Sequence, residues 1–266
     1  MSLLQIVVLA VVQGITEFLP ISSSGHLILV PVAFDWPDQG VLLDVAVHVG
    51  TLVAVMIYFW RDVGAMLAGL GRLLRGKFDP GARLAAMVVL GTLPVVGAGL
   101  ALKDMIGDDL RSLTVIGWTT LGFGIALWLA DRAGMTVRRV DHLTWRDALL
   151  IGLAQCLALV PGTSRAGITM TAARVLGYER ADSARFSMLL SIPTILAAGT
   201  LAGLEVQASG DLQLSHDMIL AGALSCLVAL AAIALMMAWL KHAGFTPFVL
   251  YRIALGSLLL WIAYAG

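Results

Sequence analysis

The chain has 266 residues, of which 59% are apolar and 13% are charged, and its mean hydropathy is +0.93. A water-soluble domain carries about a quarter of its residues as Asp, Glu, Lys or Arg, and its surface needs those charges. The composition therefore excludes a soluble enzyme, a disordered chain and a disulfide-rich secreted domain. The 17 basic and 17 acidic residues cancel, so the charge gives no support for nucleic acid as a partner. We expect an all-α polytopic membrane protein.

Six apolar stretches approach the length of about 20 residues that a helix needs to cross the hydrocarbon of a bilayer. A helix is required there, because backbone groups in lipid must form their hydrogen bonds within the segment. The six predicted transmembrane helices are Val45–Trp60, Leu84–Leu102, Thr114–Ala130, Phe186–Leu204, Met218–Leu240 and Phe248–Ala265.

Two more apolar regions are interrupted by polar segments that contain a proline. We call residues 13–26 the first elbow and residues 161–169 the second elbow. Limbs of roughly 8–13 residues flank them and are too short to span a bilayer. Irregular backbone at this depth must be buried in protein or face a water-filled cavity. We therefore predict two re-entrant helical hairpins, with limbs at Leu3–Val12, Leu27–Phe34 and Ala148–Val160 and a short limb toward Arg174.

Basic and acidic segments alternate along the chain. Placing the basic segments in the cytoplasm satisfies the positive-inside tendency, provided that both hairpins are re-entrant. Residues 33–44 and 204–217 contain no Lys or Arg and then lie outside. The segments taken as basic loops or loop edges are 61–83, 131–147, 174–185 and 241–252.

This topology predicts an inverted repeat, because the two hairpins enter from opposite sides and three spans follow each of them. We expect one membrane domain over residues 1–266, with halves at about 1–133 and 142–266. A weak alignment supports the repeat by placing Pro20 over Pro161 and Ser23 over Ser164. Both elbows would then meet near the middle of the membrane.

The first elbow contains groups that are suited to chemistry. Gln13 and Glu17 share a face of a helix, and a carboxylate inside a membrane is costly and usually marks a site. Glu17 could instead brace nearby hydroxyls. Three serines precede Gly25 and His26 and offer a nucleophile beside a proton carrier, although such a triplet is also typical of a loop or a helix N-cap. These serines are Ser22, Ser23 and Ser24.

The second elbow contains Arg165, which we interpret as the one basic residue outside the loops and their edges. Its guanidinium matches phosphate oxygens, and the following helix would present its N-terminal amides to an anion. A buried salt bridge to Glu17 is the alternative, and both states could hold in turn. His48 and Asp44 are interpreted as bracing residues, with an edge-of-site role as the minor alternative.

Together the two elbows resemble the signature motifs of the bacterial undecaprenyl-pyrophosphate phosphatase family, also called the bacitracin-resistance protein family. The likeness runs along nearly the whole chain. Position 13 is Gln where many members have Glu, and position 166 is Ala where Ser is usual. The matching motifs are Gln13-x-x-x-Glu17, Pro20-x-Ser-Ser-Ser-Gly25-His26 and Pro161-Gly-Thr-Ser164-Arg165.

The resemblance implies hydrolysis of undecaprenyl pyrophosphate to undecaprenyl phosphate and inorganic phosphate, which recycles the cell-wall lipid carrier and confers bacitracin resistance. It also implies a multi-pass protein of the bacterial inner membrane, a site facing the periplasm, and dependence on Mg²⁺ or Ca²⁺. The family positions tied to catalysis fall on Glu17, Ser23, His26 and Arg165. The predicted substrate-binding residues are Gln13, Ser22, Ser24, Gly25, Gly162, Thr163, Ser164 and Arg165, and Glu17 is the predicted metal ligand.

The sequence leaves the nucleophile open between Ser23, His26 and a metal-bound water. It also leaves one competing function, an inverted-repeat transporter or flippase for an anionic lipid, because broken helices near the midplane are a transporter design. Besides the polyprenyl pyrophosphate and membrane lipids, a second copy of the chain is a candidate partner. Gly199 and Gly203 suit a homodimer seam and internal helix packing equally well.

Overall fold

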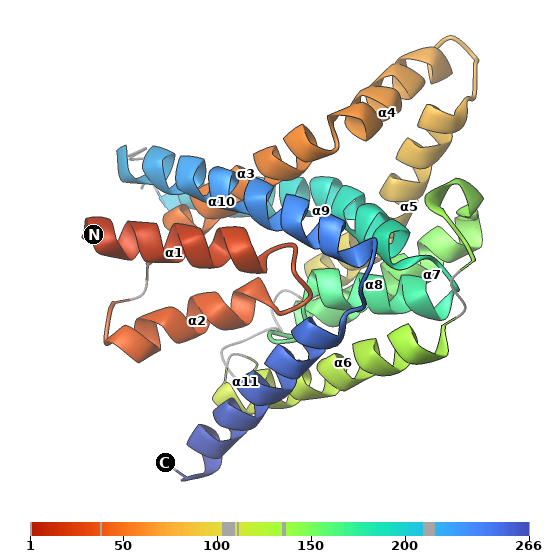
Figure 1. The fold of residues 1–266 in the computed structure, drawn as a ribbon. Helices are drawn as coiled ribbons and strands as arrows, with labels where there is room; N and C mark the ends of the chain where they lie inside the picture. The colour runs from red at the N-terminus through yellow and green to blue at the C-terminus, as the bar shows by residue number, and fades with distance from the viewer. Residues whose placement is uncertain are drawn as a thin grey trace.

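The fold is given by a computed structural model, which describes residues 2–37, 39–102, 110, 112–134, 137–209 and 216–265 (Figure 1). Six helices in this part of the chain are long and apolar enough to cross a membrane, which confirms the six predicted spans. They are α3 (Val41–Tyr58), α5 (Pro80–Ala101), α6 (Leu113–Ala133), α9 (Arg180–Ser209), α10 (His216–Leu240) and α11 (Thr246–Ala265).

Four shorter helices form the two hairpins. In Figure 1, α1 and α2 run side by side from the N-terminal side of the molecule, whereas α7 and α8 approach from the opposite side. A 3-10 turn at Cys156–Leu159 extends α7 toward the second elbow. With 11 to 14 residues each, these helices are too short to span a bilayer. Their bounds are α1 (Leu3–Thr16), α2 (Ser23–Phe34), α7 (Trp145–Gln155) and α8 (Arg165–Val175).

The helices pack in pairs that an exchange of the two halves would reproduce. Helix α1 packs on α10, and α7 packs on α5. Likewise, α3 packs on α10 and α9 on α5, while α3 packs on α9 and α6 on α11 across the centre. This is the arrangement expected of the inverted repeat. The boundaries of the halves at 1–133 and 142–266 stay a prediction.

The structure corrects the register of the repeat by one residue. Ser22 and Ser164 both occupy the N-cap of the helix that follows their elbow, and both have a positive φ, of 76° and 70°. Ser164 therefore matches Ser22, and not Ser23 as the proline-anchored alignment predicted. In the corrected register Gln13 falls directly on Gln155, which the first alignment left one residue out of step.

The basic segment 61–83 is not a plain loop, because its first part forms α4 (Trp60–Leu73). This helix follows α3 after a break at Phe59, packs against α5, and extends from the body of the molecule (Figure 1). Asp79 caps the start of α5, and its pKa lies below the ordinary value because the Ala82 N–H and the Arg72 guanidinium favour the charged form over the opposing effect of burial.

Two residues assigned to basic loops are buried instead. Arg174 lies inside α8 with 1% of its surface exposed, and it donates to Asp131 Oδ1 at 3.1 Å. Arg180 also binds Asp131, at 2.7 Å. A buried charge needs a partner of opposite charge. The sequence did not reveal that Asp131 is the partner of Arg174, because α6 and α8 are far apart in the chain and come together only in the folded structure. Arg252 is the second buried residue and belongs to the site described below.

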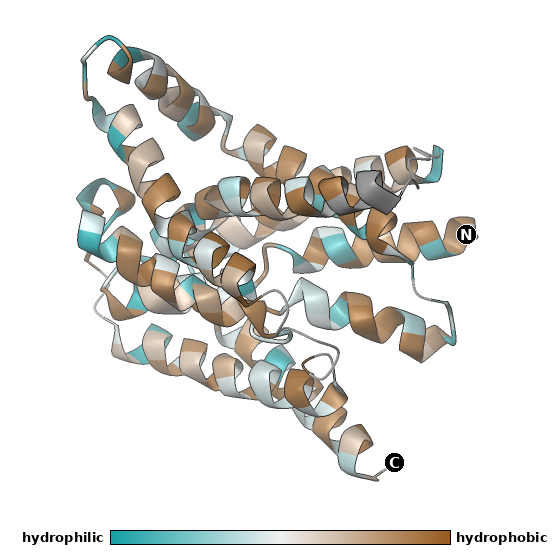
Figure 2. Ribbon diagram, turned by 180° about the vertical axis from the view of Figure 1, so that it is seen from behind, coloured by the Kyte–Doolittle hydropathy of each residue, from teal (hydrophilic) through white to brown (hydrophobic). Residues whose placement is uncertain are grey.

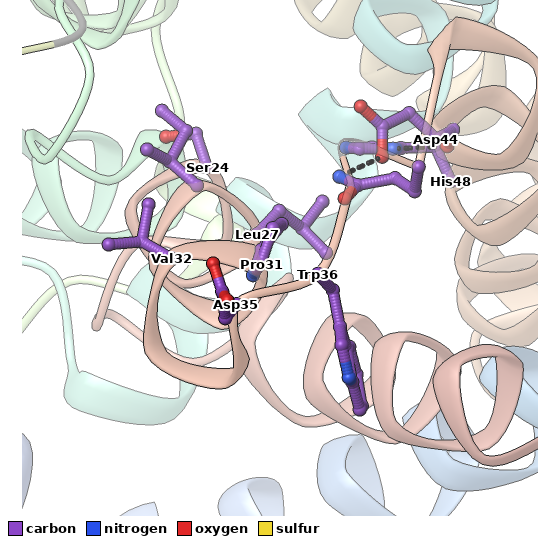
Figure 3. A pocket seen from close by; sticks show the side chains of 10 residues that line it. Ser24, Leu27, Pro31, Val32, Asp35, Trp36, Asp44 and His48 are labelled. Atoms are coloured by element: carbon purple, nitrogen blue, oxygen red, sulfur yellow. Dashed lines mark hydrogen bonds between the residues drawn. The ribbon is translucent and has the colours of Figure 1, made fainter.

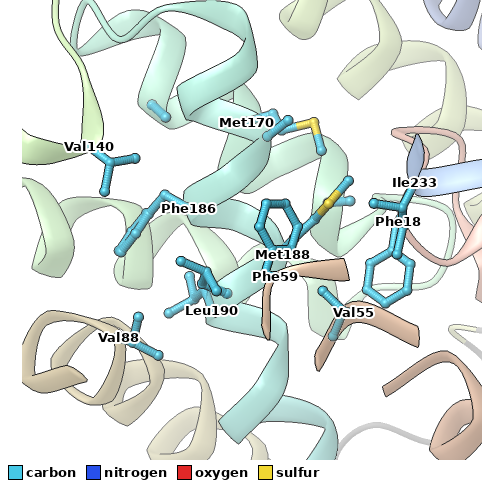
Figure 4. Close-up of a cluster of buried hydrophobic side chains, with 14 of the residues drawn as sticks. Phe18, Val55, Phe59, Val88, Val140, Met170, Phe186, Met188, Leu190 and Ile233 are labelled. Atoms are coloured by element: carbon cyan, nitrogen blue, oxygen red, sulfur yellow. The ribbon is translucent and has the colours of Figure 1, made fainter. Parts of the chain in front are cut away.

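The main apolar core lies between the hairpins and the spans. Figure 4 shows Phe18 from the first elbow near Val55 of α3 and Ile233 of α10, with Met188 of α9 beside them. Seen by hydropathy, the helices are mostly apolar along their length (Figure 2), as expected of surfaces that face lipid. An added Cβ at Gly199 would meet no atom within 4 Å, so none of the described helices packs closely on it. The surroundings of Gly203 lie outside the described part of the structure.

Candidate active site

The carboxylate of Glu17 is the centre of the first elbow. It follows α1 directly and is 7% exposed. Its Oε2 accepts hydrogen bonds from Gln13 Nε2 at 2.9 Å and from Ser23 Oγ at 2.7 Å. Gln13 lies one turn earlier on the same helix, whereas Ser23 opens α2, so the break between the two helices turns the serine hydroxyl back onto the acid. The predicted acid and predicted nucleophile are therefore in direct contact.

The second elbow presents Arg165 to the same carboxylate. Arg165 Nη2 lies 3.1 Å from Glu17 Oε1, and Nη1 donates to the Ser187 carbonyl of α9 at 3.1 Å. The guanidinium also lies over the ring of Phe18, with Cζ 5.9 Å from its centroid. The arginine side chain keeps 13% of its surface exposed. The structure therefore shows the salt bridge that the sequence left as the alternative, and anion binding by Arg165 stays a prediction.

The serines before α2 and α8 hold the elbows in shape. Ser22 Oγ accepts from the Gly25 N–H at 3.4 Å, and Ser164 Oγ accepts from the Gly167 N–H at 3.1 Å. This is ordinary N-cap bonding on an unusual backbone, since non-glycine residues rarely adopt a positive φ. Such strain persists only where the surroundings enforce it, and it is common at functional sites. Ser24 is exposed and contacts Ser22 Oγ at 3.3 Å.

The back of the second elbow is packed tightly against α6. Gly162 has a φ of 87°, and an added Cβ would lie 2.2 Å from Thr119 Oγ1 and 2.7 Å from the Ile116 carbonyl. Thr119 donates to the Pro161 carbonyl at 2.6 Å. Thr163 is fully buried. Gly162 and Thr163, predicted to bind substrate, thus lie on the buried side of the elbow.

Both ring nitrogens of His26 have partners other than Ser23 and Glu17. Its Nδ1 lies 2.6 Å from the Ser22 carbonyl, which can only accept, so Nδ1 carries a proton. Its Nε2 lies 2.5 Å from the hydroxyl of Tyr251 on α11, and the two rings stack with their centroids 5.6 Å apart. In this arrangement Ser23 donates to Glu17 and not to His26. Sequence reasoning missed Tyr251, because its contact with His26 joins residues that lie 225 positions apart in the chain.

His48 also lies closer to the site than its interpretation as a brace implied. Its Nε2 is 3.7 Å from Glu17 Oε2, and its Nδ1 lies 2.7 Å from the carbonyl of Asp44. With Ser24 it lines a cavity of about 690 Å³ between α2 and α3, which also contains Asp35 (Figure 3). The clue in the sequence was a histidine in an otherwise apolar stretch. The cavity therefore borders the first elbow through Ser24 and His48.

Arg252 overturns the expectation that Arg165 is the one basic residue outside the loops. It lies inside α11 with 0% of its surface exposed. Its hydrogen-bond acceptors among the described residues are all backbone carbonyls, and they belong to both elbows and to α6. Sequence analysis missed it because Arg252 falls both in the basic segment 241–252 and in the predicted span Phe248–Ala265, and it was counted as a loop edge.

The oxygen donors of the first elbow fit a divalent cation only when substrate oxygens complete the set. Gln13 Oε1 is buried and has no hydrogen-bond partner, which leaves an orphaned acceptor one turn from the Glu17 carboxylate. Mg²⁺ is commonly held by one or two carboxylates together with substrate phosphates. Among the described residues, no cluster of three His, Cys, Asp or Glu side chains could hold a metal by itself.

The whole chain is similar to known proteins. The family described as bacitracin resistance protein BacA matches residues 6–258. Undecaprenyl-diphosphatase 1 of Rhodospirillum rubrum is 58% identical over 100% of this chain and 97% of its own length. The undecaprenyl-diphosphatases of Jannaschia sp. and Ruegeria pomeroyi are 57% and 55% identical over the full length of both partners. With a match of this extent, and with the motif residues gathered at one place, the chain belongs to the bacitracin resistance protein BacA family.

Proposed function

We propose that this protein is an undecaprenyl-diphosphatase, which hydrolyses the terminal phosphoanhydride of undecaprenyl diphosphate to give undecaprenyl phosphate and inorganic phosphate. One observation carries the proposal at the level of chemistry. A serine hydroxyl 2.7 Å from a buried carboxylate shares that carboxylate with a guanidinium at 3.1 Å. A nucleophile, a base and an anion-binding group are thus assembled around one point, which is what phosphoryl transfer requires.

In the first step, Arg165 moves from Glu17 onto the phosphate oxygens, where it binds the charge that develops on the transferred group. Ser23 Oγ attacks the terminal phosphorus while Glu17 accepts the hydroxyl proton. A Ser–O–P bond forms, and the bridging P–O bond breaks toward undecaprenyl phosphate. The proton then passes from Glu17 to the departing phosphate group.

In the second step, water attacks the phosphoserine, and Glu17 accepts a proton from that water. The bond to Ser23 breaks while Glu17 returns this proton to Ser23 Oγ, which regenerates the serine and releases inorganic phosphate. His26 as nucleophile and direct attack by water are the rivals of this sequence. The hydrogen bond from Ser23 to Glu17, and the attachment of His26 to Tyr251, favour the serine route.

A divalent cation, Mg²⁺ or Ca²⁺, would be held by Glu17 and Gln13 Oε1 together with diphosphate oxygens, where it would neutralise charge on the two phosphates. The orphaned amide oxygen of Gln13 supports this placement. Removal of divalent ions with a chelator should then lower phosphate release, and added Mg²⁺ or Ca²⁺ should restore it.

The proposed location is the bacterial inner membrane, with the site open to the periplasm. Support comes from the cavity beside Ser24 and His48, which reaches Asp35 and Gln39 in the segment that carries no Lys or Arg. Labelling of Gln39→Cys by an impermeant maleimide from the periplasmic side tests this orientation. A homodimer seam at the open Gly199 of α9 also stays a prediction, to be checked by the mass of the purified particle.

The decisive experiment measures phosphate release from undecaprenyl diphosphate by the purified protein in detergent micelles. A transporter or flippase without chemistry would release none, because micelles hold no gradient and no second side. We expect turnover by the wild type and its loss in Arg165→Ala. The reactive Ser23–Glu17 contact favours the phosphatase over the transporter, since binding alone needs no such pair.

A further inference from the structure

Arg252 is a buried cation whose bonding pattern is unusual. In the part of the chain that the structure describes, its side chain forms no ion pair, and its guanidinium bonds only to main-chain oxygens. Burying a charge without a carboxylate is costly, so several strong acceptors must compensate it. The bonds run from Nε to Thr120 at 3.0 Å, from Nη1 to Pro20 at 3.2 Å, and from Nη2 to Thr119, Gly162 and Thr163 at 3.3, 3.0 and 3.0 Å.

These acceptors join the two halves of the site. Pro20 belongs to the first elbow, two residues before the N-cap Ser22, and Thr163 belongs to the second elbow, one residue before the N-cap Ser164. One rigid, planar guanidinium therefore bonds both elbows just before the helices α2 and α8 begin. The residues after the two caps are Ser23 and Arg165.

We propose that Arg252 is a positioning residue, which fixes the separation of the two elbows and thereby places Arg165 opposite Ser23 and Glu17. This inference rests on the proposed function. Arg252 itself does not touch the reacting atoms. A displacement of about 1 Å between reacting groups can lower a rate by about 100-fold, so a small relaxation of the elbows is enough to lower kcat.

The fork geometry is what the role requires. A lysine at position 252 keeps the charge, but its single ammonium cannot bond carbonyls of both elbows and of α6 together. Gly167 offers an independent way to disturb the same contact. An added Cβ there would lie 2.8 Å from Arg252 Nη1, so an alanine must push the guanidinium aside without changing its chemistry.

The test compares Arg252→Lys, Arg252→Met and Gly167→Ala with the control Arg174→Lys. Arg174 is a second buried guanidinium, and it lies at the other end of α8 from Arg165, where it is paired with Asp131. Thermal unfolding in detergent measures stability, and kcat and KM for undecaprenyl diphosphate are measured on the folded fraction.

We expect kcat to fall at least ~10-fold in Arg252→Lys, at least ~100-fold in Arg252→Met and about threefold in Gly167→Ala, with KM changed less than about threefold. Arg174→Lys should lose stability but keep kcat. If Arg252→Met does not fold, the lysine and Gly167 variants decide. Folded Arg252→Lys with the kcat of the wild type, or an equal kcat loss in Arg174→Lys, overturns the proposal.

A double-mutant cycle between Arg165→Lys and Arg252→Lys supplies a second readout. If Arg252 acts by placing Arg165, the two losses of kcat should combine to less than their product. Independent, multiplicative losses overturn the positioning role. Failure of the proposed function is distinguishable, because the wild type itself would then release no phosphate.

Discussion

The two elbows have the same backbone conformation at their helix caps, but they carry different side chains at the position that follows. Each turns into a helix capped by a serine with a positive φ, whose hydroxyl accepts from a glycine N–H three residues on. The residue after the cap is Ser23 in one elbow and Arg165 in the other. The repeat thus gives two equivalent positions that both contact Glu17, and one holds a hydroxyl while the other holds a guanidinium. The following predictions test that division.

The largest effect is expected at the reactive end of the first elbow. Ser23→Ala and Glu17→Gln should each lower kcat about 10³-fold or more, because one removes the attacking oxygen and the other the base. Phosphate release measures the loss. Trapping of a phosphorylated enzyme, followed by location of the modified residue, checks the order of events. A fully active Ser23→Ala protein would eliminate serine attack.

The second largest effect is expected at Arg165 in the second elbow. Arg165→Lys keeps the charge but loses the planar fork that fits phosphate, so we expect kcat to fall about 100-fold. Steady-state kinetics measure it. A near-normal kcat in this variant would mean that a positive charge is sufficient at position 165 and that the planar shape of the guanidinium is not needed.

The backbone that is particular to the second elbow is tested at Gly162, because its counterpart in the corrected register is Pro20, which cannot adopt a positive φ. Alanine there must clash with α6 and strain a positive φ, which should lower the free energy of unfolding by about 1–3 kcal/mol and reduce activity as well. Gly97→Ala on α5 is the control, since an added Cβ at that position meets nothing within 4 Å. Thermal unfolding compares the two, and equal stability would show that the turn is not held as tightly as its contacts indicate.

A smaller effect is expected from the support of His26. Tyr251→Phe removes the hydroxyl that bonds Nε2 and should lower kcat about threefold to tenfold. Tyr264→Phe, on the same helix but against Trp118, serves as the matched control and should leave kcat unchanged. A tenfold larger loss would instead indicate that His26 takes a direct part in the reaction.

The smallest effect concerns the cation. Gln13→Glu adds a second carboxylate one turn from Glu17 and should lower the Mg²⁺ concentration for half-maximal activity about threefold. Titration of Mg²⁺ after chelation measures it. An unchanged or higher concentration would place the cation away from position 13.

Composition and apolar length predicted the six spans and the two hairpins, because those follow from the cost of exposing backbone to lipid. The motifs also predicted the meeting of Glu17 with Arg165. Arg252 escaped prediction, since its acceptors are carbonyls from three distant segments and no local pattern records them. Helix α4 was missed for another reason, because its charges were read only as a sign of topology.

The contact between Glu17 and Arg165 has a consequence for how a catalytic cycle closes. In the proposed mechanism the substrate phosphate competes with the Glu17 carboxylate for the Arg165 guanidinium, so the substrate has to displace Glu17 before it binds. After cleavage, Glu17 competes with inorganic phosphate for Arg165 in the same way. Glu17, free of its proton, can reclaim the arginine and loosen the hold on inorganic phosphate. In this mechanism the ion pair that slows substrate binding also speeds the release of inorganic phosphate, so product inhibition is reduced.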